Sequence, residues 1–163
     1  MPEPFRLISE YFWLVLLGFS AFNYLKAKRD LSVRYPGPGA EGGEAGAYLL
    51  RFAIASALPW VVMGVGQISG ATPSVWYYFR PQDGNPFVLA WLGTVFLLSA
   101  VYAWWVIFEG GAKRVREFNL MAVIGQHSST QSERVIKLLA AGSVLLFPVW
   151  VLLAVSMNAK VPH

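Results

Sequence analysis

The chain has 163 residues, of which 56% are hydrophobic and only 13% are charged, and its formal net charge is +4. Soluble domains carry about 25% charged residues. Because the charges here cluster between long apolar runs, the composition excludes a large soluble core and predicts one polytopic transmembrane domain over residues 1–163.

The same composition argues against two other classes of protein. The basic residues lie in short loops beside the apolar runs, which favours orientation in a bilayer over nucleic-acid binding. The chain has no cysteine, which excludes disulfides, CxxC redox pairs and thiolate metal sites.

The first apolar run predicts a membrane span over about residues 5–27. The residues before it lack the lysine-rich start of a cleavable signal peptide, so we expect this span to be retained. Ser20 and Asn23 lie three residues apart on one face of the predicted helix, where each needs a partner on another helix. We interpret both as packing residues, with contact to a pore or a ligand as the alternative.

Residues 35–46 are too rich in glycine and proline to hold a helix, and we expect a flexible cytoplasmic linker there. A second span follows over about residues 47–69, with Gly64 and Gly66 inside it and Gly70 just beyond. Small residues let helix backbones approach closely, which replaces the hydrophobic driving force that lipid cannot supply. We therefore expect this helix to lie at the centre of the bundle.

Two polar side chains, Ser56 and Gln67, lie within the second span. Gln67 is the most polar group well inside the apolar run, and we interpret it as a hydrogen-bonding residue between helices rather than a ligand contact.

The segment after the second span is dense in aromatic residues. Thr72 before Pro73, and Asn85 before Pro86, are each a typical pair for starting a helix. We therefore expect a short interfacial helix after Thr72, with its aromatic side chains at headgroup depth, and a new span after Asn85. The alternative is a platform that binds a partner or a hydrophobic ligand. The aromatic side chains are Trp76, Tyr77, Tyr78 and Phe79.

The third span covers residues 87–108, a run without formal charge, proline or amide side chains. At about 1.5 Å per residue it is roughly 33 Å long, enough to cross a hydrocarbon core of about 30 Å. In the segment that follows, residues 112–125, apolar residues recur at helical spacing and Lys113, Arg114 and Arg116 occupy the other side. This pattern predicts an amphipathic cytoplasmic helix on an anionic membrane surface.

A fourth span is predicted over about residues 135–157, and the basic residues orient all four. Ten of the lysines and arginines lie in or beside the first and third loops, and three lie on the opposite side. This bias places both loops in the cytoplasm and both termini on the non-cytoplasmic side of a membrane that we expect to be the plasma (inner) membrane.

Several chemistries lack their signatures in this sequence. No histidine lies inside a span, so a buried bis-histidine haem has no ligands, and no carboxylate lies at mid-bilayer to carry protons. His127 precedes Ser128, Ser129 and Thr130, but no motif positions a nucleophile there. We therefore predict no catalytic, metal-binding or cofactor-binding residues.

The expected fold is all-α, a four-transmembrane-helix bundle with short interfacial helices. We expect a non-enzymatic helix-packing or accessory subunit of a membrane assembly, with membrane lipid and either copies of itself or other membrane proteins as partners. The alternative is a homo-oligomeric channel or small transporter, which needs symmetry because four helices alone enclose little space. Its path would be lined by Ser20, Asn23, Ser56 and Gln67. An enzyme acting on a lipid is a weaker third interpretation.

Overall fold

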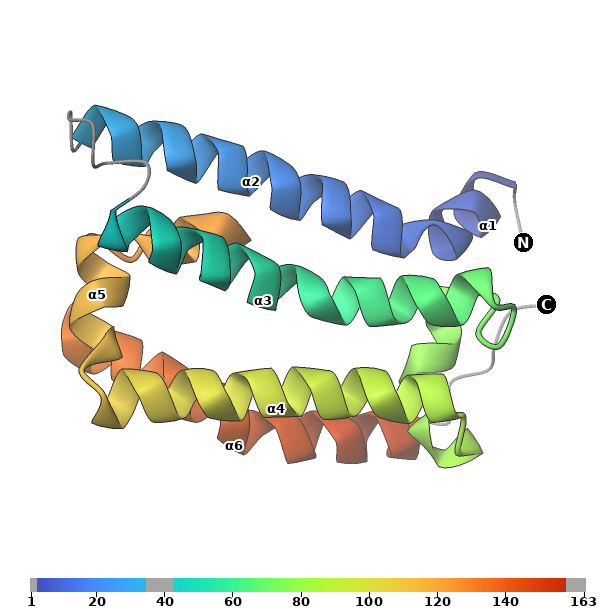
Figure 1. The fold of residues 1–163 in the computed structure, drawn as a ribbon. Coiled ribbons are helices and arrows are strands. Elements are labelled where there is room, and N and C mark those ends of the chain that lie inside the picture. Colours follow the sequence, from blue (N-terminus) through green and yellow to red (C-terminus); the bar gives the residue numbers. More distant parts are fainter. Residues whose placement is uncertain (1–2, 35–42, 158–163) are drawn as a thin grey trace.

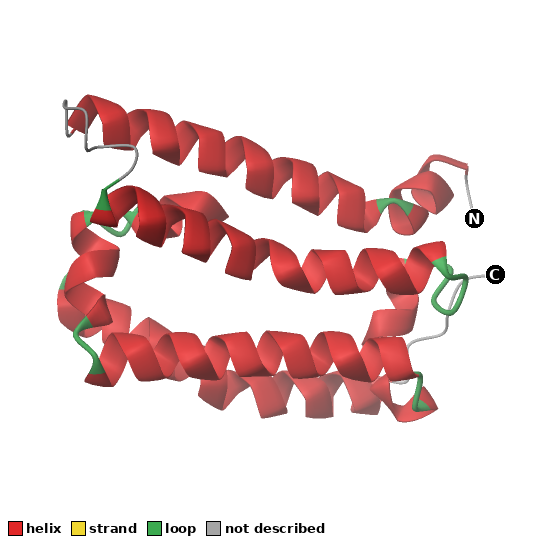
Figure 2. Ribbon diagram, in the orientation of Figure 1, coloured by secondary structure: helices red, strands yellow, loops and turns green. Residues whose placement is uncertain are grey.

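The structure, a computed structural model, describes residues 3–34 and 43–157, and every regular element in these ranges is helical (Figure 2). Most of the linker predicted at residues 35–46 lies outside the described residues. In order, the elements are α1 (Glu3–Glu10), α2 (Phe12–Arg34), α3 (Glu44–Ile68), η1 (Val75–Phe79), η2 (Pro81–Asp83), α4 (Pro86–Phe108), α5 (Gly111–Glu117), η3 (Leu120–Ile124) and α6 (Glu133–Met157), where η denotes a 3-10 helix.

Three helices, α3, α4 and α6, are long and apolar enough to cross a membrane. They begin and end within three residues of the predicted second, third and fourth spans. Much of their apolar surface points away from the protein, as shown by Ile68, which is 75% exposed, and Leu145, which is 72% exposed. Such a surface is costly in water and stable in hydrocarbon, which supports the assignment of a membrane protein.

The predicted first span, residues 5–27, is not one continuous helix. The chain breaks at Tyr11, and α2 then continues to Arg34, beyond the predicted end. The apolar part of α2 before Lys26 is about 14 residues long, or roughly 21 Å, which is shorter than a hydrocarbon core of about 30 Å. For this reason α2 is not among the three helices that could cross a membrane by themselves.

The long helices pack as an open row rather than as a closed bundle. In this row α2 packs on α3, α3 packs on α4, and α4 packs on α6 (Figure 1). Within the described ranges, no other pair of these four helices forms an extensive contact. The predicted four-helix bundle is therefore not confirmed, because α2 and α6 lie at opposite ends of the row.

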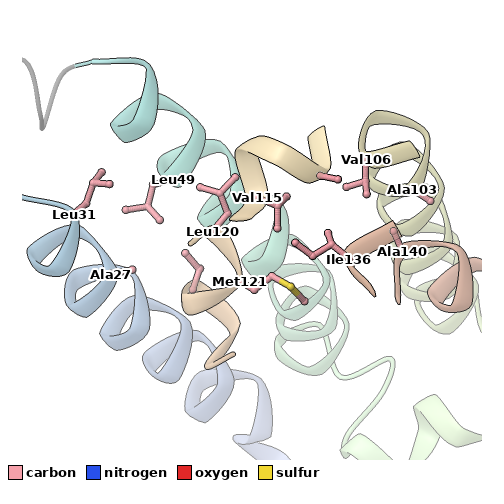
Figure 3. Packing of buried hydrophobic residues seen from close by; sticks show 12 residues of the cluster. Ala27, Leu31, Leu49, Ala103, Val106, Val115, Leu120, Met121, Ile136 and Ala140 are labelled. Carbon is pink, nitrogen blue, oxygen red and sulfur yellow. The ribbon is translucent and has the colours of Figure 1, made fainter. Parts of the chain in front are cut away.

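One buried cluster holds the four long helices together, near the helix ends beside α5 and η3. Helices from the whole row contribute to it: Ala27 and Leu31 from α2, Leu49 from α3, Val106 from α4, Val115 from α5, Leu120 and Met121 from η3, and Ile136 and Ala140 from α6 (Figure 3). Segment η3 packs on both α2 and α3, and α5 packs on α4 and α6. The connection between the last two long helices thus joins both ends of the row.

The amphipathic helix predicted over residues 112–125 is two short elements instead. Helix α5 ends at Glu117, and η3 follows Asn119, whose backbone is left-handed with φ of 50°. Val115, on the apolar side of α5, is 0% exposed. Its apolar side therefore packs on protein and does not lie in lipid, because the neighbouring helices offer it a closer apolar surface.

Candidate functional site

The aromatic segment between α3 and α4 folds inward, against the expectation for Tyr78. This residue is 1% exposed, whereas Trp76 is 37% exposed and stays at the surface. The Tyr78 hydroxyl donates to the Met63 carbonyl at 3.1 Å and lies 3.0 Å from the Thr72 hydroxyl. Because the Tyr78 hydroxyl gives its one proton to Met63, the Thr72 hydroxyl is the donor to the Tyr78 oxygen. Thr72 is thus occupied with Tyr78, and Ser74 stands at the start of η1 instead.

Burial raises the pKa of the Tyr78 hydroxyl above its ordinary value, and the hydrogen bond with Thr72 opposes this shift. Removing the hydroxyl from water makes the phenolate unfavourable, so Tyr78 keeps its proton and acts as a fixed hydrogen-bond donor. This arrangement ties the segment to α3 and gives Tyr78 a structural role, because the buried side chain cannot contact lipid headgroups.

Trp91 on α4 lies at the centre of a second buried region, near the ends of the long helices that lie away from α5 and η3. Its ring meets those of Tyr78, Trp150 and Trp60 at centroid distances of 5.4, 6.0 and 6.5 Å. Tyr77 is partly buried and packs against the same cluster. These rings come from η1, α3, α4 and α6, so aromatic packing joins the middle and one end of the row.

Asn85 starts α4, as predicted from its position before Pro86. Its side-chain oxygen accepts a hydrogen bond from the Phe87 amide at 3.0 Å, and its Nδ2 donates to the Ala71 carbonyl at 2.8 Å. The single side chain therefore caps one helix and fixes the end of the preceding segment.

The three glycines singled out from the sequence play different roles. A Cβ at Gly64 would lie 2.6 Å from the Trp13 ring of α2, and a Cβ at Gly66 would lie 2.5 Å from the Tyr78 hydroxyl. Both glycines therefore permit close packing. Gly70 does not, because nothing lies within 4 Å of its Cβ position; its φ of 76° instead ends the helical path after α3.

Gln67 hydrogen bonds across helices, as its position in the second span suggested. Its Nε2 lies 3.3 Å from the carbonyl oxygen of Ser9 in α1. In a continuous helix that carbonyl would accept from the amide of Trp13, but the break at Tyr11 leaves it available. Gln67 thus stabilises the break that divides the predicted first span.

The four polar residues predicted as an alternative pore lining lie in different surroundings. Ser56 donates to the Ala53 carbonyl of its own helix at 2.9 Å, and Ser20 is partly buried on α2. Asn23 lies close to the backbone of Gly125, since a Cβ at that glycine would be 3.6 Å from Asn23 Nδ2. Gln67 is engaged with α1, so the described contacts do not bring the four residues to one surface.

The basic residues of α5 also differ from one another. Lys113 and Arg116 are exposed. Arg114 pairs with Glu44, with Nε and Oε1 3.3 Å apart, and its guanidinium lies 5.1 Å from the centroid of the Tyr48 ring. Part of its charge is therefore directed at α3, whereas Lys113 and Arg116 present theirs to the surroundings.

Hydrogen bonds that the sequence did not predict join Ser128 and Ser129, in the loop before α6, to Val115 of α5 and to Asn119. Ser128 is 0% exposed; its hydroxyl donates to the Val115 carbonyl at 2.8 Å, and its amide donates to Asn119 Oδ1 at 2.8 Å. The Ser129 amide donates to the same oxygen at 3.2 Å. Ser128 thus has a structural role. The available signal was Asn119, a residue type that tolerates left-handed backbone, between two short apolar pieces.

No group of three or more histidine, aspartate or glutamate residues able to hold a metal ion occurs in the part of the chain that the structure describes. Comparisons with protein-family models, with curated protein sequences and with solved structures found no match to this chain.

Proposed function

We propose that this protein is a non-enzymatic helix-packing subunit of a membrane assembly. The observation that supports this most is the open row of helices, which leaves α6 with one main helical neighbour, α4. Only 11% of the most apolar 18-residue stretch of α6 is buried within the chain. A helix in this position offers most of its length to another membrane protein or to a second copy.

The outer surface of α6 has a spacing suited to helix packing. Leu138, Leu145 and Leu152 are 71%, 72% and 68% exposed and recur every seven residues. Gly142 and Val149 fall between them, and nothing lies within 4 Å of the Cβ position of Gly142. A seven-residue repeat keeps one seam facing a partner helix in left-handed packing, and a small residue in the seam permits close approach. We refer to these five residues as the α6 seam.

The proposed setting is the plasma (inner) membrane. The basic residues collect near α5, η3 and the neighbouring ends of the long helices, and this bias favours a cytoplasmic location for that side of the protein. The same bias favours a non-cytoplasmic location for both termini. Membrane lipid contacts the exposed apolar surfaces that no partner covers.

The first test is the native mass of the tagged protein, isolated from its own membrane in a mild detergent or in nanodiscs. Co-purification with other chains in a fixed ratio supports an accessory subunit, and a discrete multiple of 18.1 kDa supports a homo-oligomer. A mass of one chain with lipid alone would contradict the proposal.

Cysteine cross-linking then locates the interface, because the natural chain has no cysteine. Single substitutions Leu138→Cys, Leu145→Cys and Leu152→Cys are expected to form disulfide-linked products in membranes when the partner is a second copy. Leu97→Cys on α4, where the native side chain is 62% exposed, is the matched control outside the seam. Cross-linking at Leu97 alone would place the interface elsewhere.

The second candidate is a homo-oligomeric channel or small transporter lined by Ser20, Asn23, Ser56 and Gln67. The observation in its favour is Asn23, whose buried Nδ2 has no acceptor among the described residues. Asn23→Leu and Gln67→Leu separate the two candidates. Loss of a measured ion flux in liposomes with assembly intact supports the channel, and weaker assembly without any wild-type flux supports the packing subunit.

A further inference from the structure

A small polar cleft lies between α2 and the end of η3. Its cavity has a volume of about 40 Å³, and its polar lining comes from Asn23, Lys26 and Asp30 of α2 and from Gln126 and His127 after η3. Gly125, with φ of 78°, forms part of the wall and keeps its backbone close to Asn23 without filling the space. The cleft thus combines groups from two parts of the chain that are far apart in sequence.

Asn23 is the buried member of this lining. It is 6% exposed, and its Nδ2 has no hydrogen-bond acceptor among the described residues. A buried donor without an acceptor is unfavourable, because it has lost its hydrogen bonds to water. An acceptor that enters the cleft would therefore gain a preformed donor.

The charged members of the lining lie four residues apart on α2, which places them on one face of the helix. Lys26 supplies a positive charge beside Asn23, and Asp30 supplies a negative charge one turn further on. A simple anion satisfies the first two residues but is repelled by Asp30. A group that carries a phosphate and, a few bonds away, an ammonium satisfies all three.

The depth of the cleft indicates where such a group would come from. Residues Phe12–Leu25 of α2 carry no formal charge, and Lys26 begins a run that includes Lys28 and Arg29. The cleft therefore lies where the apolar part of α2 gives way to its charged part, which is the depth of lipid headgroups.

We propose that this cleft binds the phosphoethanolamine headgroup of a membrane phospholipid. Asn23 and Lys26 hold the phosphate oxygens, and Asp30 holds the ammonium. The apolar side chains around α2 continue toward the membrane and accommodate the start of the acyl chains. This assignment does not depend on the proposed role in an assembly, because a single chain contains all of the residues.

The test is native mass spectrometry of the delipidated full-length protein, titrated with phosphatidylethanolamine or phosphatidylglycerol in a mild detergent. We expect one phosphatidylethanolamine per chain to be retained more tightly than phosphatidylglycerol. Asn23→Leu and Lys26→Gln should each weaken its binding by about tenfold, since each removes a hydrogen bond to a charged group. Asp30→Asn should abolish the preference between the two lipids.

Arg29→Gln is the matched control, because it removes the same charge from the same exposed stretch of α2 at a position outside the cleft. Its affinity should stay within about twofold of wild type, consistent with screening of exposed charges. An equal loss with Arg29→Gln, or no loss with Lys26→Gln, would overturn the proposal. Lys26 is exposed, so Lys26→Gln decides the matter even if Asn23→Leu impairs folding.

Competition distinguishes the lipid from a soluble source of the same chemistry. Millimolar inorganic phosphate or free phosphoethanolamine should leave the bound lipid in place. Displacement by either compound, or equal retention of phosphatidylglycerol by the wild type, would overturn the assignment of a phosphoethanolamine lipid site.

Discussion

The Tyr78 hydroxyl lies where it does because residue 66 is glycine: a Cβ at Gly66 would stand 2.5 Å from it and 2.7 Å from Thr72 Oγ1. Gly66→Ala should therefore displace η1 and destabilise the protein by about 1–3 kcal/mol, the usual cost of overpacking. Thermal unfolding in detergent measures this. Gly93→Ala in α4, where nothing lies within 4 Å, is the control and should be neutral or slightly stabilising. Equal stability of both variants would contradict this account.

Tyr78→Phe should cost about 1–2 kcal/mol, because it removes the hydrogen bonds to Met63 and Thr72 while keeping the ring. Unfolding in denaturant at neutral pH measures the loss. Tyr77→Phe, one residue away, is the matched control and should change the stability little. Similar losses of stability in both variants would mean that the hydrogen bonds of the Tyr78 hydroxyl do not stabilise the fold.

The same residue predicts a loss of stability at alkaline pH. The pKa of Tyr78 is raised in the folded protein, so the folded state keeps a proton that the unfolded state releases above its ordinary value of 10.0. The contribution of Tyr78 to the free energy of unfolding is therefore fully present below pH 10. It falls as the pH rises through 10 toward the pKa of the folded state. Comparing unfolding curves over this range should show a smaller decline for Tyr78→Phe than for Tyr77→Phe. Parallel declines would rule out this contribution.

Asn119→Ala should destabilise the protein by about 2–4 kcal/mol, because the Ser128 and Ser129 amides lose their acceptor and alanine disfavours a left-handed backbone. Asn119→Asp keeps an acceptor oxygen and tolerates this backbone, so it should recover most of the stability. Thermal unfolding and the rate of proteolysis near residues 126–132 provide the measurements. If Asn119→Ala were as stable as Asn119→Asp, these hydrogen bonds would contribute little to stability.

The basic residues of α5 should contribute unequally to contact with anionic lipid. Lys113→Gln and Arg116→Gln should each lower the relative affinity for an anionic over a zwitterionic lipid by about fivefold, from about 1 kcal/mol per basic residue at a charged surface. Arg114→Gln should have a smaller effect, because Glu44 already pairs with this guanidinium. Spin-labelled lipids in reconstituted membranes report the selectivity. A larger effect for Arg114 than for Lys113 would contradict this order.

Continuous apolar runs were sufficient to locate α3, α4 and α6, because length and hydropathy alone decide whether a helix can cross a membrane. The break at Tyr11 could not be read in this way. It depends on the Ser9 carbonyl finding a donor in Gln67, a residue 58 positions away that hydropathy does not connect to it.

Burial of the connecting segments was equally hard to anticipate. Tyr78 looked like an interfacial residue because its neighbours are aromatic, yet the absence of a side chain at Gly66 decides its position. The α5 segment showed an amphipathic pattern that fits lipid and protein equally well. Only the packing of α4 and α6 against Val115 distinguishes the two. The Asn23 cleft depends in turn on Gly125, which lies about a hundred residues further along the chain.

The open row also has a consequence for biogenesis. Each long helix packs on the next one in the chain, so every one of these contacts can form as soon as the later helix enters the bilayer. Segment η3 is different, because it is made late and packs on the early helices α2 and α3. Its docking is the step at which a segment made after α4 contacts the first two long helices.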